Sequence, residues 1–85
     1  MEKQKFTATF NGHCYIKAYG RKFYKKGYSL TDIRDELGNQ IPDQKISLIK
    51  AFDIIKDKTI SHKVEFMAKF DGDRILYISD VKIIQ

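Results

Sequence analysis

The sequence is poor in the residues that build disulfides and metal sites. Its 85 residues include one cysteine, Cys14, and two histidines. A single cysteine excludes an internal disulfide, and three such residues are too few for a zinc site built from four cysteine and histidine ligands. There is also no apolar run of the ~18 residues that a membrane-spanning helix needs. We therefore expect a protein of the reducing cytoplasm, with no metal, cofactor or membrane span.

Acidic residues are missing from the first third of the chain. Residues 3–31 hold seven lysines and arginines and no acid, whereas residues 32–85 hold nine cations and ten acids. The net charge of +5 therefore comes from the first third. Charge that is segregated in this way favours a polyanionic partner such as nucleic acid. The alternative interpretation is that these lysines only keep the protein soluble.

The rest of the composition is typical of one globular unit. Hydrophobic residues make up 42 % and aromatic residues 13 % of the chain, which is enough to form a core. Two separate domains would each be too small to bury a core of their own. We predict a single domain over residues 1–85.

Alternating apolar and polar residues predict a mainly β fold. The alternation over residues 5–19 is too long for a straight strand in so small a domain, at ~3.3 Å per residue. Gly12 is the expected bend point. Leu30 and Ile33 are three positions apart instead of two, which indicates a β-bulge in the second strand. The strands are expected over residues 5–19, 28–34, 40–46, 63–70 and 74–84.

Two segments interrupt the alternation. Pro42 cannot donate to a ladder of hydrogen bonds, so the third strand should lie at an edge or be bulged. In residues 47–57 the period changes, and Leu48, Phe52 and Ile55 fall on one helical face with Ile49 beside them. One short helix is therefore predicted between the third and fourth strands.

This order of elements resembles the OB fold, a five-stranded barrel with a helix between its third and fourth strands. Residues 28–41 are similar to the second strand and turn of nucleic-acid-binding OB folds, where an apolar-polar run reaches a charged turn that ends in glycine. Residues 64–70 and 78–83 are similar to their fourth and fifth strands. The chain also resembles small OB proteins of phages and mobile elements. The resemblance implies an OB-like barrel whose ligand lies across strands two and three and the first and last connecting loops.

The expected connection between the first two strands has the composition of a surface that binds single strands. Cations there hold phosphates while flat rings stack on bases. The alternation places Tyr15, Lys17 and Tyr19 on the polar face of the first strand, although Phe23 or Tyr24 turned inward to close the barrel end is an alternative. The candidate binding residues are Tyr15, Lys17, Tyr19, Arg21, Lys22, Phe23, Tyr24, Lys25, Lys26 and Tyr28.

Other segments limit the expected affinity. The third strand offers no aromatic ring, and the loop at residues 71–74 is acidic apart from Arg74. Binding of DNA or RNA should therefore be modest, dependent on salt and weakly selective for sequence. Duplex binding is less favoured, because the predicted helix carries Asp53 and Asp57 and a heavily apolar face.

No set of catalytic residues is visible. His13 and Cys14 are neighbours in a strand, so their side chains point to opposite faces and cannot form a thiolate–imidazole pair. Asp32, Asp35 and Glu36 gather near one turn, where carboxylates are usually solvated. We predict that the protein is not an enzyme.

A protein-interaction module is the competing hypothesis. A basic, tyrosine-rich hairpin also suits an acidic protein surface, as in a phage-type inhibitor or adaptor. Lysine, which dominates here, is depleted at protein interfaces, and this favours phosphate as the partner. Self-association as a homo-oligomer, through Met67, Ile49 and Ile54, stays open.

Overall fold

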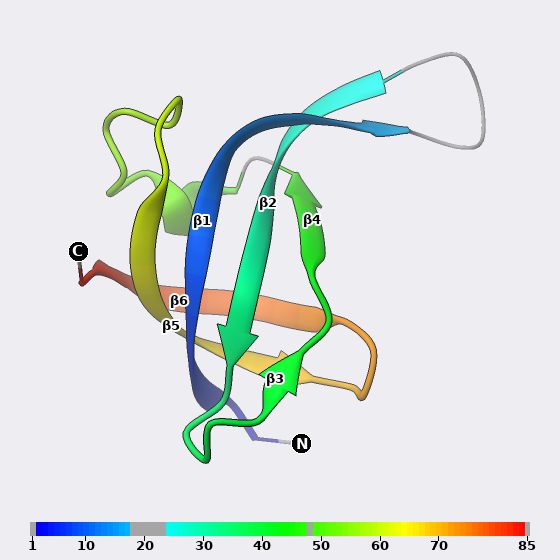
Figure 1. The fold of residues 1–85 in the computed structure, drawn as a ribbon, viewed down its shortest axis with the longest axis vertical. Coiled ribbons are helices and arrows are strands. Elements are labelled where there is room, and N and C mark those ends of the chain that lie inside the picture. Colours follow the sequence, from blue (N-terminus) through cyan, green and yellow to red (C-terminus); the bar gives the residue numbers. More distant parts are fainter. Residues whose placement is uncertain (1, 18–23, 48, 85) are drawn as a thin grey trace.

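Six β-strands form one antiparallel sheet, which curls around the core (Figure 1). The computed structural model describes residues 2–17, 24–47 and 49–84, and describes only the backbone between residues 13 and 26. The order in the sheet is β3-β2-β1-β5-β6, with β4 paired to β2. This confirms the predicted mainly β fold. The strands are β1 (Gln4–Lys17), β2 (Tyr24–Arg34), β3 (Gln40–Ile41), β4 (Gln44–Ser47), β5 (His62–Phe70) and β6 (Ile75–Ile83).

The expected third strand is divided in two around Pro42. Its parts, β3 and β4, both pair with β2, and they form one edge of the sheet. This agrees with the prediction, because a proline has no N–H to contribute to a central ladder.

The short helix predicted over residues 47–57 is not confirmed. The described part of this segment, residues 47 and 49–57, holds a single 3-10 turn, η1 (Lys50–Phe52), and no α-helix. Phe52 and Ile55 are buried as the helical pattern required, but Ile49, which was expected beside them, is exposed. η1 directs Phe52 into the core, and the tight turn that follows, in which the N–H of Ile55 donates to the Phe52 carbonyl oxygen at 3.0 Å, directs Ile55 there. A longer helix was not needed, and isolated helices this short are marginal in water.

Four irregularities bend the sheet, two in the pairing of β1 with β2 and two in that of β5 with β6. Three of them include a non-glycine residue with positive φ, namely Asp32 at 48°, Tyr77 at 57° and Asp80 at 54°. The bulge at Asp32 separates the buried side chains of Leu30 and Ile33, which confirms the bulge predicted from their spacing.

The fourth irregularity lies between Asn11 and His13, at the predicted bend residue Gly12. Figure 1 shows that β1 bends before it enters its far end. A Cβ added to Gly12 would lie 2.8 Å from the carbonyl oxygen of Thr59. Glycine therefore allows the backbone before β5 to pack against the bend.

The two edges of the curled sheet approach each other without forming a ladder. The side chain of Gln44, in β4, donates from Nε2 to the carbonyl oxygen of Asp73 at 3.0 Å. Its Oε1 accepts a hydrogen bond from the N–H of Ile75, in β6, at 3.3 Å. Among the described residues the sheet thus remains open, and closure into the predicted barrel is not confirmed. The hydrogen bonds that cross the gap within the described chain come from the side chain of Gln44.

The core fills the inside of the curled sheet. Phe10 packs on Phe52, with ring centroids 5.0 Å apart, and Phe6 stacks on Phe66 at 5.9 Å. The alternation correctly assigned the buried side chains of residues 6–10 in β1 and of residues 64–68 in β5. The fully buried larger side chains are Phe6, Phe10, Phe52, Phe66, Leu30, Ile33, Ile55 and Val64.

Candidate nucleic-acid interface

The far ends of β1 and β2 form a two-stranded ribbon that extends from the body of the protein (Figure 1). In the described part of the chain, β1 pairs with β5 only as far as Phe10, and β2 pairs with β4 only from Gly27 onward. We call residues 13–17 and 24–27, together with the connecting residues 18–23, the β1–β2 ribbon. Its two strands pair with each other, and among the described strands β4 alone reaches the ribbon, through the pairing of Ser47 with Gly27.

The register of the ribbon sets tyrosines opposite lysines. Tyr15 lies across from Lys26, and Lys17 lies across from Tyr24. Lys25 lies opposite Ile16. The backbone therefore brings five of the predicted binding residues into two adjacent strands. Predicted residues that lie outside the described part of the chain are Tyr19, Arg21, Lys22 and Phe23.

Tyr28 belongs to the core instead of the interface. Its residue is 5 % exposed, and its ring stacks on Phe10 with the centroids 5.0 Å apart and an interplanar angle of 27°. A ring in this position is not available to stack on a base. The sequence contained the signal for this correction, because Tyr28 and Leu30 are two positions apart and therefore share one face of the strand.

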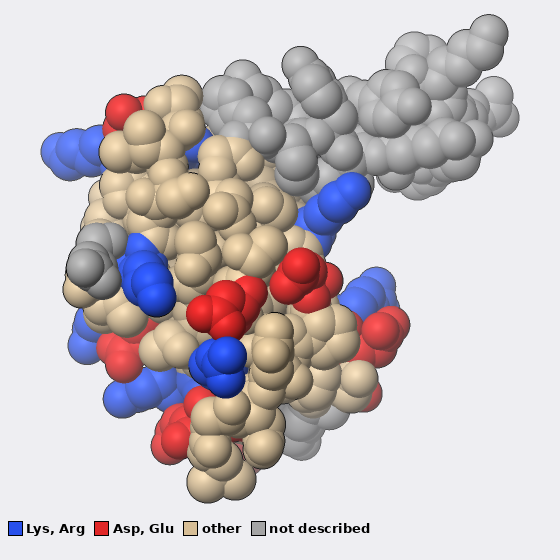
Figure 2. Space-filling model, in the orientation of Figure 1, with Lys and Arg blue, Asp and Glu red and all other residues tan. Residues whose placement is uncertain are grey.

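Apart from the ribbon, the chain is electrically neutral. Residues 17–26 contain five of the 16 lysines and arginines and none of the 11 acids. The rest of the chain therefore carries equal numbers of cations and acids at pH 7. On the face that Figure 2 shows, blue and red side chains are interspersed, and neither sign forms a large patch there. The ribbon alone accounts for the net charge of +5.

Polar side chains hold the base of the ribbon. Asn11 Nδ2 donates to Thr31 Oγ1 at 2.8 Å and to the carbonyl oxygen of Thr9 at 3.3 Å. Ser61 Oγ donates to Asn11 Oδ1 at 3.2 Å. Asn11 thus connects β1, β2 and the segment before β5 next to the bend. Sequence analysis assigned no role to Asn11, and its position beside the expected bend was the one available signal.

The acids of the turns mostly serve the turns themselves. In the β5–β6 turn, the backbone N–H groups of Arg74 and Asp73 donate to the carboxylate of Asp71 and lower its pKa. Asp35 accepts hydrogen bonds from the backbone N–H groups of Leu37 and Asn39 in the β2–β3 turn. Within the described residues, no three histidine, cysteine or acidic side chains are grouped to hold a metal ion.

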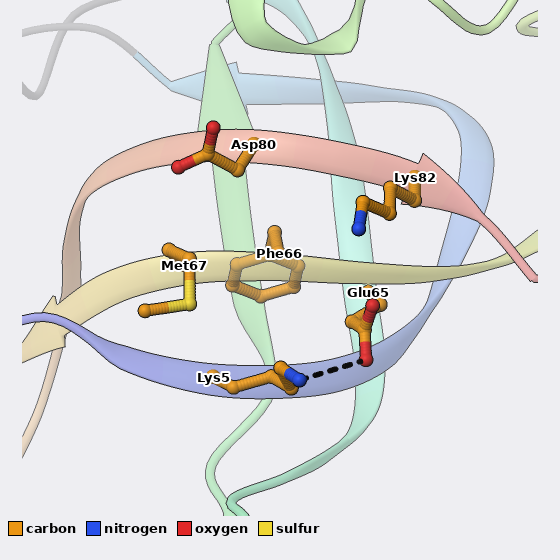
Figure 3. Close-up of a pocket in the computed structure, with 6 residues that line it drawn as sticks. All are labelled: Lys5, Glu65, Phe66, Met67, Asp80 and Lys82. Carbon is orange, nitrogen blue, oxygen red and sulfur yellow. Dashed lines mark ion pairs between the residues drawn. The ribbon is translucent and has the colours of Figure 1, made fainter.

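A shallow hollow of about 260 Å³ lies on the outer face of β1, β5 and β6 (Figure 3). Lys5 and Glu65 point toward each other there and form an ion pair at 3.7 Å, while Asp80 and Lys82 project from β6. The hollow is smaller than the ~300–1,000 Å³ of typical ligand pockets. With two cations and two acids in its lining, it has no net attraction for phosphate.

No protein-family model, curated protein or solved structure matches this chain. In the described part of the chain, none of the helical turns is long and apolar enough to cross a bilayer. The features of the molecule that point to a function are therefore the geometry and the charge of the ribbon.

Proposed function

We propose that this protein is an OB-like barrel that binds single-stranded DNA or RNA through the β1–β2 ribbon and catalyses no reaction. One observation carries the proposal: the entire net charge lies in a ribbon that extends from a neutral body. The curled sheet with its Gln44 bridge supports the barrel, and η1 lies where the OB fold has its helix.

The chemistry of the ribbon suits an unpaired strand. Its cations neutralise phosphates and release their counterions, so affinity falls as salt rises. Its rings offer stacking surfaces, each worth ~1–3 kcal/mol per base. Stacking of this kind needs unpaired bases, and so it favours single strands over duplexes. Because the body is neutral, long-range attraction comes from the ribbon alone, and we expect modest affinity with little sequence preference.

The first test is fluorescence anisotropy of labelled oligo-dT and oligo-U strands at low and moderate salt. We expect saturable binding that weakens with salt, and a duplex of the same length should bind less tightly. The comparison of the two strands identifies the preferred sugar. Absence of binding at low salt would contradict the proposal and would favour an acidic protein surface as the partner.

A charge-matched pair of variants tests the location of the site. Substitution of Lys22, Lys25 and Lys26 by alanine should lower the salt slope by about 2, since each phosphate contact with a single strand contributes about 0.7. The control replaces three exposed lysines of the body, Lys50, Lys56 and Lys63, and removes the same total charge. The control should keep the wild-type slope. Equal losses in both variants would show that net charge matters and the ribbon does not.

Ring removal tests stacking separately from charge. Tyr19→Ala or Tyr24→Ala should weaken binding about 5- to 150-fold, which corresponds to one stacked base. The salt slope should stay unchanged, because no phosphate contact is lost. Unchanged affinity in both variants would refute base stacking in the ribbon.

A further inference from the structure

Tyr77 is an aromatic ring displayed on the outside of β6. It is 70 % exposed and lies at one of the bulges in the β5–β6 pairing. Its φ of 57° places its backbone in the left-handed region. Bulky residues rarely adopt this region, because the Cβ crowds the backbone there.

The bulge itself does not require a tyrosine. Glycine or asparagine adopts positive φ with less strain and would form the same bulge. The fold therefore tolerates strain at a position where the ring makes little contribution to the core. Strained residues of this kind cluster at functional sites, and bulges redirect side chains there.

A lysine accompanies the exposed ring. Lys69 Nζ lies 5.4 Å from the centre of the Tyr77 ring, in the geometry of a cation–π contact. Most of Tyr77 remains exposed, so the lysine leaves ring surface free for another group. The body therefore carries the same combination of a tyrosine ring and a lysine that the sequence places in the ribbon.

One of the two acids of the neighbouring turn is already engaged within the turn. Asp71 accepts hydrogen bonds from the turn backbone and pairs with Arg74, with 4.0 Å between Oδ2 and Nε. On the other side, Lys3 Nζ donates to Ser79 Oγ at 2.6 Å, which places a further cation on β6. Lys69 therefore lies beside Tyr77, and the side chain of Lys3, from the segment before β1, reaches Ser79 farther along β6.

We propose that Tyr77 and Lys69 form a second contact for the single strand, on the body of the protein. One base stacks on the free surface of Tyr77, and Lys69 holds an adjacent phosphate. This inference rests on the proposed function, and it assigns to β6 a binding role that depends on unpaired bases.

Photochemical cross-linking locates the contact directly. The probes are oligo-dT strands of about 4 to 16 nucleotides, the range of site sizes for single OB folds, with one 5-iodouracil each. Trypsin cleaves after Arg74 and Lys82, so the peptide of residues 75–82 contains Tyr77 as its single aromatic residue. We expect cross-links on this peptide as well as on peptides of the ribbon. Cross-links on the ribbon alone would overturn this inference and leave the proposed function intact.

Substitutions at Tyr77 separate binding from stability. Tyr77→Gly relieves the backbone strain, so the unfolding midpoint should not fall, while affinity for the longer strands should drop at least fivefold. Tyr77→Phe keeps the ring and should keep the affinity. Asp80→Gly is the matched control, because it relieves a similar φ of 54° in the same strand without removing a ring. It should not weaken binding.

The salt dependence of binding tests the contribution of the Lys69 charge. Lys69→Ala should lower the salt slope by about 0.7, whereas Tyr77→Gly should leave the slope unchanged. Wild-type affinity and slope in both variants would overturn the second contact. If the wild-type protein binds no strand at all, the proposed function fails, and this inference fails with it.

Discussion

Gln44 should contribute to stability far more than an ordinary glutamine on a sheet edge, because its side chain replaces a missing ladder. Gln44→Ala removes the donor to Asp73 and the acceptor for the N–H of Ile75. Each hydrogen bond contributes ~0.5–1.5 kcal/mol, and the group is only half-buried, so we expect a loss of ~1–2 kcal/mol. In a domain of this size the melting temperature should fall by roughly 5–15 °C.

Thermal and urea unfolding measure this loss, and hydrogen exchange reports where it occurs. Gln40→Ala is the matched control, because Gln40 is exposed on the same edge in β3. Its effect should stay within about 0.5 kcal/mol. In Gln44→Ala, the amide of Ile75 should also exchange faster than in the wild type. Equal stability of the two variants would refute the view that Gln44 holds the two edges together.

Three further predictions concern the bend at Gly12, the core residue Phe52 and the loss of stability at low pH. Gly12→Ala forces a Cβ to within 2.8 Å of the Thr59 carbonyl oxygen and should cost ~1–3 kcal/mol in urea unfolding; unchanged stability would show that the bend has room for a side chain. Phe52→Ala should cost ~3–5 kcal/mol by calorimetry, because the ring is buried, and a smaller loss would mean that the cavity collapses. The pKa of Asp57 is lowered by hydrogen bonds from the Thr59 hydroxyl and N–H, and that of Asp71 by backbone N–H groups. Their contribution is therefore present above the unfolded pKa of ~3.9 and is lost as the pH falls through the lower folded values. The free energy of unfolding, measured from pH 6 to pH 2, should therefore decline, and the decline should be smaller in Asp71→Asn. If the pH dependence of this variant equals that of the wild type, the hydrogen-bonded carboxylate of Asp71 does not contribute to it.

Local spacing predicted the features that depend on neighbouring residues. The bend at Gly12 and the bulge between Leu30 and Ile33 follow from strand length and from an interrupted period of two. Composition gave the wrong prediction at Tyr28, because the tyrosines clustered before it suggested an exposed ring, although Tyr28 shares a strand face with the buried Leu30. The predicted helix failed for another reason, since the 3-10 turn η1 and the tight turn after it bury Phe52 and Ile55 equally well.

Tyr77 could not be assigned a face from the sequence. Two bulges lie within β6, at Tyr77 and Asp80, and each shifts the alternation of the strand. The orientation of a side chain after a bulge depends on the register with the partner strand. That register is a property of the assembled sheet.

By itself, the sequence determined the mainly β architecture, the bent first strand and the placement of all net charge in one short segment. These properties follow from periodicity and composition, which act between residues that are close in the chain. The tertiary structure decided that Tyr28 is buried, that Gln44 joins β4 to β6 and that Tyr77 stands beside Lys69. Those outcomes depend on segments up to 31 residues apart, as in the bond from Gln44 to Ile75. Only the register and curvature of the folded sheet bring such segments together.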